Sequence, residues 1–133
     1  MNRVLFSSLS DDWTTPKDIY DWLDREFHFT FDPCPLYSDF DGLLIDWTGD
    51  IVFCNPPYSN ILPWVQKSYL ESCFNGVTVV LLLPARTDSK WFHDFILPFC
   101  SEIRFIRGRL KFGGAKYNAP FPSMVCIFGG KRN

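Results

Sequence analysis

The sequence has no apolar run of the ~20 residues that a membrane-spanning helix needs, and no signal peptide is apparent. It has no CxxC pair, and histidine occurs only twice among 133 residues. The five cysteines are scattered, which favours reduced, buried thiols over disulfides or a zinc site. Repeats and low-complexity segments are absent as well. We therefore expect one cytoplasmic domain over residues 1–133, with residues 1–10 as a loose arm, no membrane and no bound metal.

Charge is unevenly distributed along the chain. Residues 1–85 hold four basic and twelve acidic residues, whereas residues 86–133 hold nine basic and three acidic residues. Such a split is typical of a protein that presents one side to a polyanion, and it is equally compatible with an ordinary solvated surface.

Helical stripes and apolar runs alternate along the chain, and 47% of the residues are hydrophobic, enough for a sizeable core. This alternation predicts an α/β sheet. The first expected helix begins at Pro16, with Thr15 as its N-cap. Two further helices are expected at residues 61–74 and 89–99. The expected strands are residues 27–31, 43–46, 51–54, 77–83, 102–107 and 123–128.

Polar side chains follow several of these strands directly. Asp32 follows the first strand, the run Asn55-Pro56-Pro57-Tyr58 follows residues 51–54, and Arg86 comes soon after residues 77–83. Two successive prolines force a rigid, extended exit from a strand. Ligands of open α/β sheets bind at the carboxyl ends of the strands, so we expect these side chains at a functional edge.

An ordered set of motifs along residues 11–129 resembles the small phage-encoded DNA N-6-adenine methyltransferases of Dam type. The motifs are Trp13-x-Thr15-Pro16, Asp32-Pro33-Cys34, Asp41-Gly42-Leu43-x-x-x-Trp47, Asn55-Pro56-Pro57-Tyr58-Ser59, Leu83-Pro84-Ala85-Arg86-Thr87 and Gly108-Arg109-Leu110-x-Phe112. The resemblance implies a compact Rossmann-like fold that depends on S-adenosylmethionine, with a mostly parallel sheet and an antiparallel C-terminal strand.

The resemblance also gives the Asn-Pro-Pro-Tyr run its chemistry, the transfer of a methyl group to the N6 amine of adenine. An aromatic amine is a poor nucleophile, because its lone pair is delocalised into the ring. The Asn55 side-chain carbonyl and the Pro56 backbone carbonyl can accept its two N–H groups, with Pro57 stiffening the turn and Tyr58 stacking on a base rotated out of the duplex. This reaction requires no metal.

S-adenosylmethionine is the methyl donor that the family implies. The residues expected to hold it are Trp13, Thr15, Pro16, Asp32, Pro33, Cys34 and Asp46. In the family pattern a Gly-rich turn follows the Asp-Pro pair, whereas here Pro35-Leu36-Tyr37 follows.

The implied partner is double-stranded DNA, and the setting is the cytoplasm of a host cell if a phage or prophage encodes the chain. A separate target-recognition domain is missing, so recognition has to come from short loops or from a second subunit in a homodimer. Arg86, Arg109 and Lys111 are the residues expected to contact DNA, with Arg104 on the opposite face of its strand.

Two alternatives remain open from the sequence. Asn-Pro-Pro-Tyr also occurs in N-methyltransferases that act on protein glutamine or on RNA, although a protein substrate does not need the basic C-terminal third. The missing Gly-rich turn favours a second alternative, a catalytically degenerate domain that binds nucleic acid or a protein partner.

Overall fold

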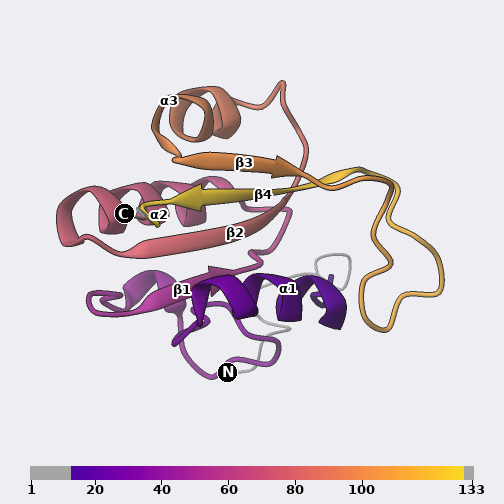
Figure 1. The fold of residues 1–133 in the computed structure, drawn as a ribbon, viewed down its shortest axis with the longest axis horizontal. Helices are drawn as coiled ribbons and strands as arrows, with labels where there is room; N and C mark the ends of the chain where they lie inside the picture. Colours follow the sequence, from indigo (N-terminus) through magenta and orange to yellow (C-terminus); the bar gives the residue numbers. More distant parts are fainter. Residues whose placement is uncertain (1–12, 131–133) are drawn as a thin grey trace.

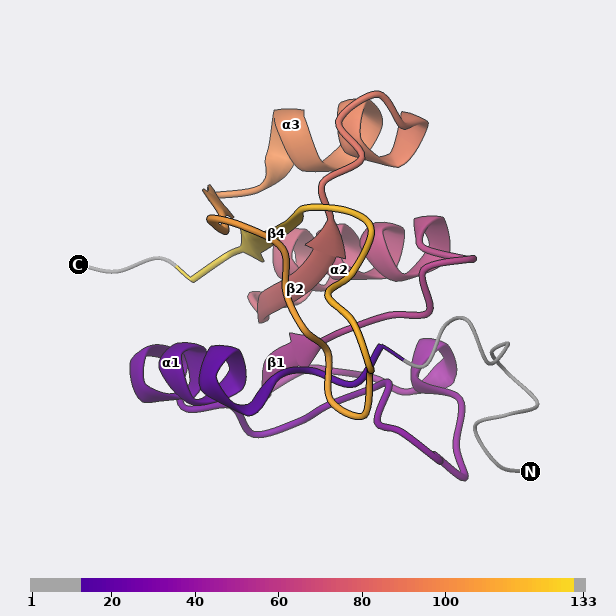
Figure 2. The ribbon, with the colours of Figure 1, turned by 90° about the vertical axis from the view of Figure 1, so that its right-hand side faces the viewer.

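The computed structural model describes residues 13–130, so the arm expected at residues 1–10 lies outside the described residues. The structure is a mixed α/β fold with a four-stranded sheet, and α1 and α2 lie on opposite sides of that sheet (Figures 1 and 2). In chain order, the elements are α1 (Lys17–Phe27), the 3-10 turn η3 (Gly42–Leu44), β1 (Ile51–Cys54), α2 (Leu62–Asn75), β2 (Thr78–Pro84), the π-helical turn η4 (Phe92–Ile96), α3 (Leu97–Phe99), β3 (Glu102–Phe105) and β4 (Ser123–Phe128).

The strand order of the sheet is β1-β2-β4-β3. Val52 of β1 lies opposite Val79 in a parallel pair, whereas Val125 of β4 lies opposite Leu82 and Arg104 in antiparallel pairs. The C-terminal strand is therefore antiparallel as expected, but two of the three strand pairs are antiparallel. The expectation of mostly parallel pairing was wrong, because β4 lies between β2 and β3 and pairs with both.

The hydrophobic core is centred on β2 and β4. Every residue of β4 is buried, as is every residue of β2 after Thr78. On one face α1 buries Leu23 and Phe27. On the other face α2 buries Trp64 and Val65 and ends where Gly76 takes a left-handed conformation.

Two predicted strands are not formed. The strand expected at residues 27–31 is reduced to one parallel bridge between Phe31 and Val52. After α1, His28 takes a left-handed conformation with φ 58, and the Asp24 carboxylate accepts a hydrogen bond from the next backbone amide. The left-handed residue and this hydrogen bond hold the chain in a turn, so the segment reaches β1 with its last two residues, Thr30 and Phe31.

The segment expected as a strand at residues 43–46 begins instead in η3. The Asp41 carboxylate accepts a hydrogen bond from Leu43 N at 3.0 Å and caps this short turn. A brief apolar run such as Leu43-Leu44-Ile45 fits either a strand or a helical turn, so periodicity alone misassigned it.

Within residues 13–130, no helix has the length and apolar character needed to cross a membrane. Cys34, Cys54 and Cys126 are buried as expected, whereas Cys73 is exposed and Cys100 is partly exposed.

Candidate active site

The side chain of Asn55 lies at the carboxyl end of β1, and its amide is held in one orientation. Nδ2 donates hydrogen bonds to the Trp13 carbonyl at 2.5 Å and to Thr15 Oγ1 at 3.0 Å. A backbone carbonyl can only accept, so the amide nitrogen has to face Trp13 and Oδ1 has to point away. Oδ1 is buried, and no hydrogen-bond partner for it exists among residues 13–130. A buried acceptor without a donor costs ~1–3 kcal/mol, so Oδ1 is prepared to receive an N–H group.

A cavity of about 350 Å³ lies beside Asn55. Its volume falls within the ~300–1,000 Å³ that small-molecule sites occupy. Four of the residues expected to hold a donor line it together with Asn55. The lining residues are Trp13, Thr14, Thr15, Lys17, Tyr20, Asp32, Cys34, Leu36, Phe53 and Asn55.

Lys17, Tyr20 and Phe53 are lining residues that the sequence analysis missed. Tyr20 lies one helical turn after Lys17, and its ring meets Phe53 edge-on at 5.2 Å. Phe53 is two residues before Asn55, so both side chains point to the same face of β1. This shared parity was a readable signal for Phe53.

The Asp32 carboxylate gives the cavity an acidic wall. It also closes its own turn, because Oδ1 accepts a hydrogen bond from Cys34 N at 2.9 Å. Burial raises the pKa of Tyr20, and the carboxylates of Asp24 and Asp32 raise it further. The Tyr20 hydroxyl therefore stays protonated near neutral pH, and the carboxylate favours a ligand that carries a positive charge.

A second cavity of about 150 Å³ lies behind the Asp32 turn. Cys34 lines both cavities, so the turn at Asp32 separates them. Its lining residues are Pro33, Cys34, Ser38, Phe40, Asp41, Gly42, Leu43, Pro57, Asn60 and Trp64. Pro33 and Pro57 both line this second cavity and neither lines the cavity beside Asn55, so the predicted roles of both residues stay predictions.

Pro16 and Asp46 line neither of these two cavities. Pro16 precedes α1 and its carbonyl accepts a hydrogen bond from Tyr20 N. Asp46 is exposed and accepts hydrogen bonds from the Thr48 hydroxyl at 2.6 Å and from Thr48 N at 2.8 Å. These bonds, the hydroxyl first, lower the pKa of Asp46. Asp46 closes a local turn, so this geometry gives no support to a role in donor binding.

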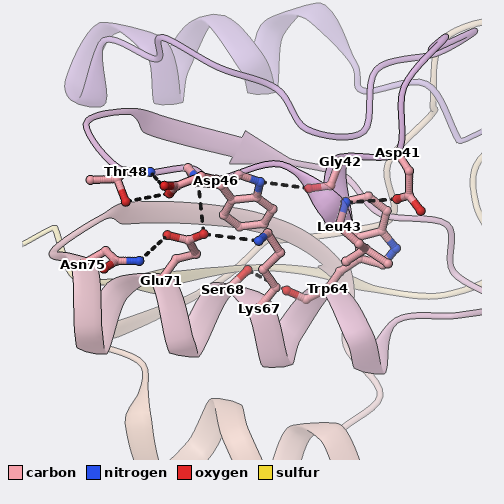
Figure 3. A network of polar contacts seen from close by, with 11 residues as sticks. Asp41, Gly42, Leu43, Asp46, Thr48, Trp64, Lys67, Ser68, Glu71 and Asn75 are labelled. Atoms are coloured by element: carbon pink, nitrogen blue, oxygen red, sulfur yellow. Dashed lines mark hydrogen bonds and ion pairs between the residues drawn. The ribbon is translucent and has the colours of Figure 1, made fainter.

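Trp47 fixes the segment behind the second cavity onto α2. Figure 3 shows its partners, Gly42 of η3 and Glu71 of α2. Its indole Nε1 donates to the Gly42 carbonyl at 3.0 Å, and its backbone N donates to the Glu71 carboxylate at 3.2 Å. Asn75 and Lys67 also donate to that carboxylate. Burial acts to raise the pKa of Glu71, but the hydrogen bonds outweigh it and the pKa is lowered.

Tyr58 is buried in the structure. Its ring meets Phe112 and Phe121 edge-on at 6.2 and 5.7 Å, and its hydroxyl donates to the Leu82 carbonyl at 3.2 Å. Burial raises the pKa of Tyr58 well above its ordinary value. Stacking of this ring on a base therefore requires the loop of residues 106–122, which carries both phenylalanines, to move away.

The predicted DNA contacts separate into two groups. Arg86 Nη1 donates to the Tyr58 carbonyl at 2.9 Å, so this arginine braces the Asn-Pro-Pro-Tyr turn. Arg109 and Lys111 are exposed on the loop of residues 106–122, which contains four basic and no acidic residues. Arg104 is bound to the carboxylates of Glu26 and Glu102 instead.

Among residues 13–130, no cluster of His, Cys, Asp or Glu is arranged to hold a metal ion.

These features define an α/β protein with a four-stranded mixed sheet, in which a cavity and a buried amide acceptor lie together after the end of β1. The chain belongs to the DNA N-6-adenine-methyltransferase (Dam) family, whose model matches residues 4–125. The DNA N-6-adenine-methyltransferase of Haemophilus phage HP1 (strain HP1c1) is 32% identical over 108 residues, which cover 72% of this chain and 62% of that relative. The chain therefore spans less than two thirds of the length of this relative. No solved structure gave a significant match.

Proposed function

We propose that the chain is a DNA methyltransferase that transfers a methyl group from S-adenosylmethionine to the N6 amine of adenine in double-stranded DNA. The observation that carries the proposal is the buried Asn55 Oδ1, which lacks a donor among residues 13–130. An exocyclic amine supplies that donor. Asn55 Oδ1 accepts one N–H and the Pro56 carbonyl accepts the other, which draws the nitrogen towards tetrahedral geometry and frees its lone pair to attack.

The cavity beside Asn55 fits the methyl donor of such a reaction. S-adenosylmethionine, when bound, supplies an electrophilic methyl group on a positively charged sulfur. The Asp32 carboxylate complements a cationic ligand, and the rings of Trp13, Tyr20 and Phe53 give the cavity aromatic walls. The turn at Asp32, closed by its hydrogen bond to Cys34 N, takes the place of the family's Gly-rich turn.

The strand directions favour a Rossmann-like methyltransferase domain over the whole chain. β4 is antiparallel to both β2 and β3, so β1, β2 and β3 run in the same direction. The bridge between Phe31 and Val52 adds a parallel contact at the open edge of β1. Asp32 and Asn55 then both follow carboxyl ends at one edge of the sheet, where ligands of such folds bind.

The exposed basic loop of residues 106–122 is the proposed DNA contact. Arg109 and Lys111 supply phosphate contacts, whereas Arg86 acts on the turn that holds Tyr58. The phage relative fits an enzyme that acts in the cytoplasm of a host cell. A homodimer as a second source of target recognition stays a prediction.

Mass spectrometry of nucleosides from DNA incubated with the protein and labelled S-adenosylmethionine tests this function. We expect N6-methyl-2′-deoxyadenosine, and Asn55→Ala should lower the rate ~10²–10³-fold while donor binding persists. Gln66→Ala is the matched amide control, because Gln66 is exposed on α2 and lines neither the 350 Å³ nor the 150 Å³ cavity. Methylcytosine as the sole product, or a methylated protein with unmodified DNA, would contradict the proposal.

A further inference from the structure

Thr15 does not cap α1, although its sequence context predicts that it does. The helix begins at Lys17, and the residue before it, Pro16, makes no side-chain cap. The Thr15 hydroxyl instead lies 3.0 Å from Asn55 Nδ2, a residue 40 positions further along the chain. A side chain that is well suited to cap a helix is used here to hold the amide of another residue.

The segment that contains Thr15 is itself fixed by the loop of residues 106–122. Gly113 N donates to the Thr14 carbonyl at 2.8 Å, and the Trp13 ring meets Phe112 and Phe121 edge-on, each at 5.4 Å. A Cβ added at Gly113 would lie 3.3 Å from the Thr14 side chain, so this approach is close. The Trp13 carbonyl and the Thr15 hydroxyl are therefore held in place relative to β1.

We propose that Thr15 is a positioning residue that fixes the direction of Asn55 Oδ1 through the opposite end of the amide, an inference that rests on the proposed function. Rotation of an asparagine amide about χ2 is soft, so the side chain alone does not set where Oδ1 points. The two acceptors of the Nδ2 hydrogen bonds, the Trp13 carbonyl and the Thr15 hydroxyl, together define the plane of the amide. Removal of the Thr15 hydroxyl leaves one N–H without a partner and the Trp13 carbonyl as the remaining acceptor, so the amide is held less tightly in the orientation that receives the substrate amine.

Thr15 also lines the donor cavity, so the test has to separate positioning from donor binding. Thr15→Val keeps the shape of the side chain and removes the acceptor, whereas Thr15→Ser keeps the acceptor. Thr48→Val is the control, because Thr48 is exposed, lines neither of the two cavities and donates its hydroxyl to Asp46 instead of binding Asn55.

With saturating donor and DNA, Thr15→Val should lower kcat about tenfold. The donor Kd should change less than about twofold, and Thr15→Ser should behave as wild type. A Thr15→Val enzyme with wild-type kcat overturns the inference. So does a variant that loses donor affinity and keeps its kcat. If Thr15→Val does not fold, the comparison of Thr15→Ala with Thr15→Ser decides the same question.

An NMR measurement tests the geometry without any turnover. The side-chain amide signals of Asn55, assigned by their absence in Asn55→Ala, should shift in Thr15→Val and stay in place in Thr15→Ser. Unchanged signals in both variants overturn the positioning role. Absence of N6-methyl-2′-deoxyadenosine from the wild-type reaction contradicts the proposed function instead, and the NMR comparison still decides the role of Thr15.

Discussion

Gly42 lies where the backbone of the Asp32 turn passes closest to η3, and Gly42→Ala tests how the cavity wall is supported. A Cβ built at Gly42 would lie 1.8 Å from the Pro33 carbonyl oxygen and 2.6 Å from its carbon. Both atoms belong to the backbone, so no side-chain rotation relieves the clash. The Pro33 carbonyl has to move by about 1.2 Å to reach the 3.0 Å that real Cβ atoms respect.

The position of Pro33 in the chain sets the expected loss of donor affinity. Pro33 lies between Asp32 and Cys34, which both line the 350 Å³ cavity, so the shift displaces one cavity wall. Overpacking of a core costs ~1–3 kcal/mol of the free energy of unfolding. Misplacement of a site by ~1 Å costs up to ~10²-fold in rate. We therefore expect donor affinity to fall about tenfold or more, which corresponds to ~1.4 kcal/mol or more of binding free energy.

Calorimetric titration with S-adenosylmethionine, together with urea unfolding, measures both effects. Gly49→Ala is the matched control, because Gly49 has φ +88 and a Cβ there meets nothing within 4 Å. Its left-handed backbone costs ~1–2 kcal/mol on substitution by alanine, without any clash near the cavity. Both variants should lose stability, and only Gly42→Ala should lose donor affinity. Wild-type donor affinity in Gly42→Ala, or an equal loss of donor affinity in Gly42→Ala and Gly49→Ala, would refute this account of the cavity wall.

Three further predictions concern residues elsewhere in the site. Tyr58→Ala should lower the free energy of unfolding by ~3–5 kcal/mol and Tyr58→Phe by ~1 kcal/mol, because the ring fills the core and the hydroxyl makes one buried hydrogen bond. If Tyr58→Ala abolishes methylation while the free energy of unfolding is unchanged, the ring acts on the substrate instead. The pKa of Glu71 lies below its ordinary value of 4.5 in the folded state, so its ionised form stabilises the fold above that pH and the stabilisation is lost as the pH falls through the folded pKa. Urea unfolding between about pH 6 and pH 3 should therefore show a smaller loss of stability in Glu71→Gln than in wild type, and equal pH dependence would contradict this sign. Arg109→Ala should reduce the slope of log affinity for DNA against log salt by ~1. Arg104→Ala is the control, because its guanidinium is already paired with carboxylates. If the slope changes only in Arg104→Ala, DNA binds on the face that carries Arg104 and the proposed contact is wrong.

Strong local patterns allowed much of the fold to be predicted from the sequence. The strand at residues 51–54 and the final strand at residues 123–128 are confirmed to the residue. α2 begins one residue later than expected and ends at the Asn75-Gly76 stop. These elements carry continuous apolar runs or a glycine that takes a left-handed conformation, so local chemistry and tertiary packing favour the same structure.

The failures came from polar side chains that bind locally. Asp41 caps a 3-10 turn where residues 43–46 were predicted as a strand. Asp24 holds the amide after His28 in a turn where residues 27–31 were predicted as a strand. The predicted cap by Thr15 failed for the opposite reason, because a partner 40 residues away took its hydroxyl. Such long-range partners leave no trace in the spacing of residues along the chain.

Residues that lie in local motifs could be placed in the site from the sequence, whereas residues that depend on a distant loop could not. Trp13, Thr15, Asp32 and Cys34 gather around one cavity with Asn55, because their motifs follow strands or precede a helix at one edge. The burial of Tyr58 could not be read from the sequence. It depends on Phe112 and Phe121, which a loop without regular structure carries back onto the ring.

The docking of the loop of residues 106–122 onto Trp13 also has a consequence for the order of folding. Asn55 is oriented by Trp13 and Thr15, and these are held by Gly113 and the loop phenylalanines. Contacts between such distant parts of a chain form late, because the intervening segments have to be ordered first. In a refolding experiment the docking of Trp13 should coincide with the return of activity and come after the sheet has formed. Because the chain has five tryptophans, the signal of Trp13 is followed as the difference in fluorescence between wild type and Trp13→Phe. The Asn55 amide would thus acquire its direction from the docked loop, after the strand that precedes it has already formed.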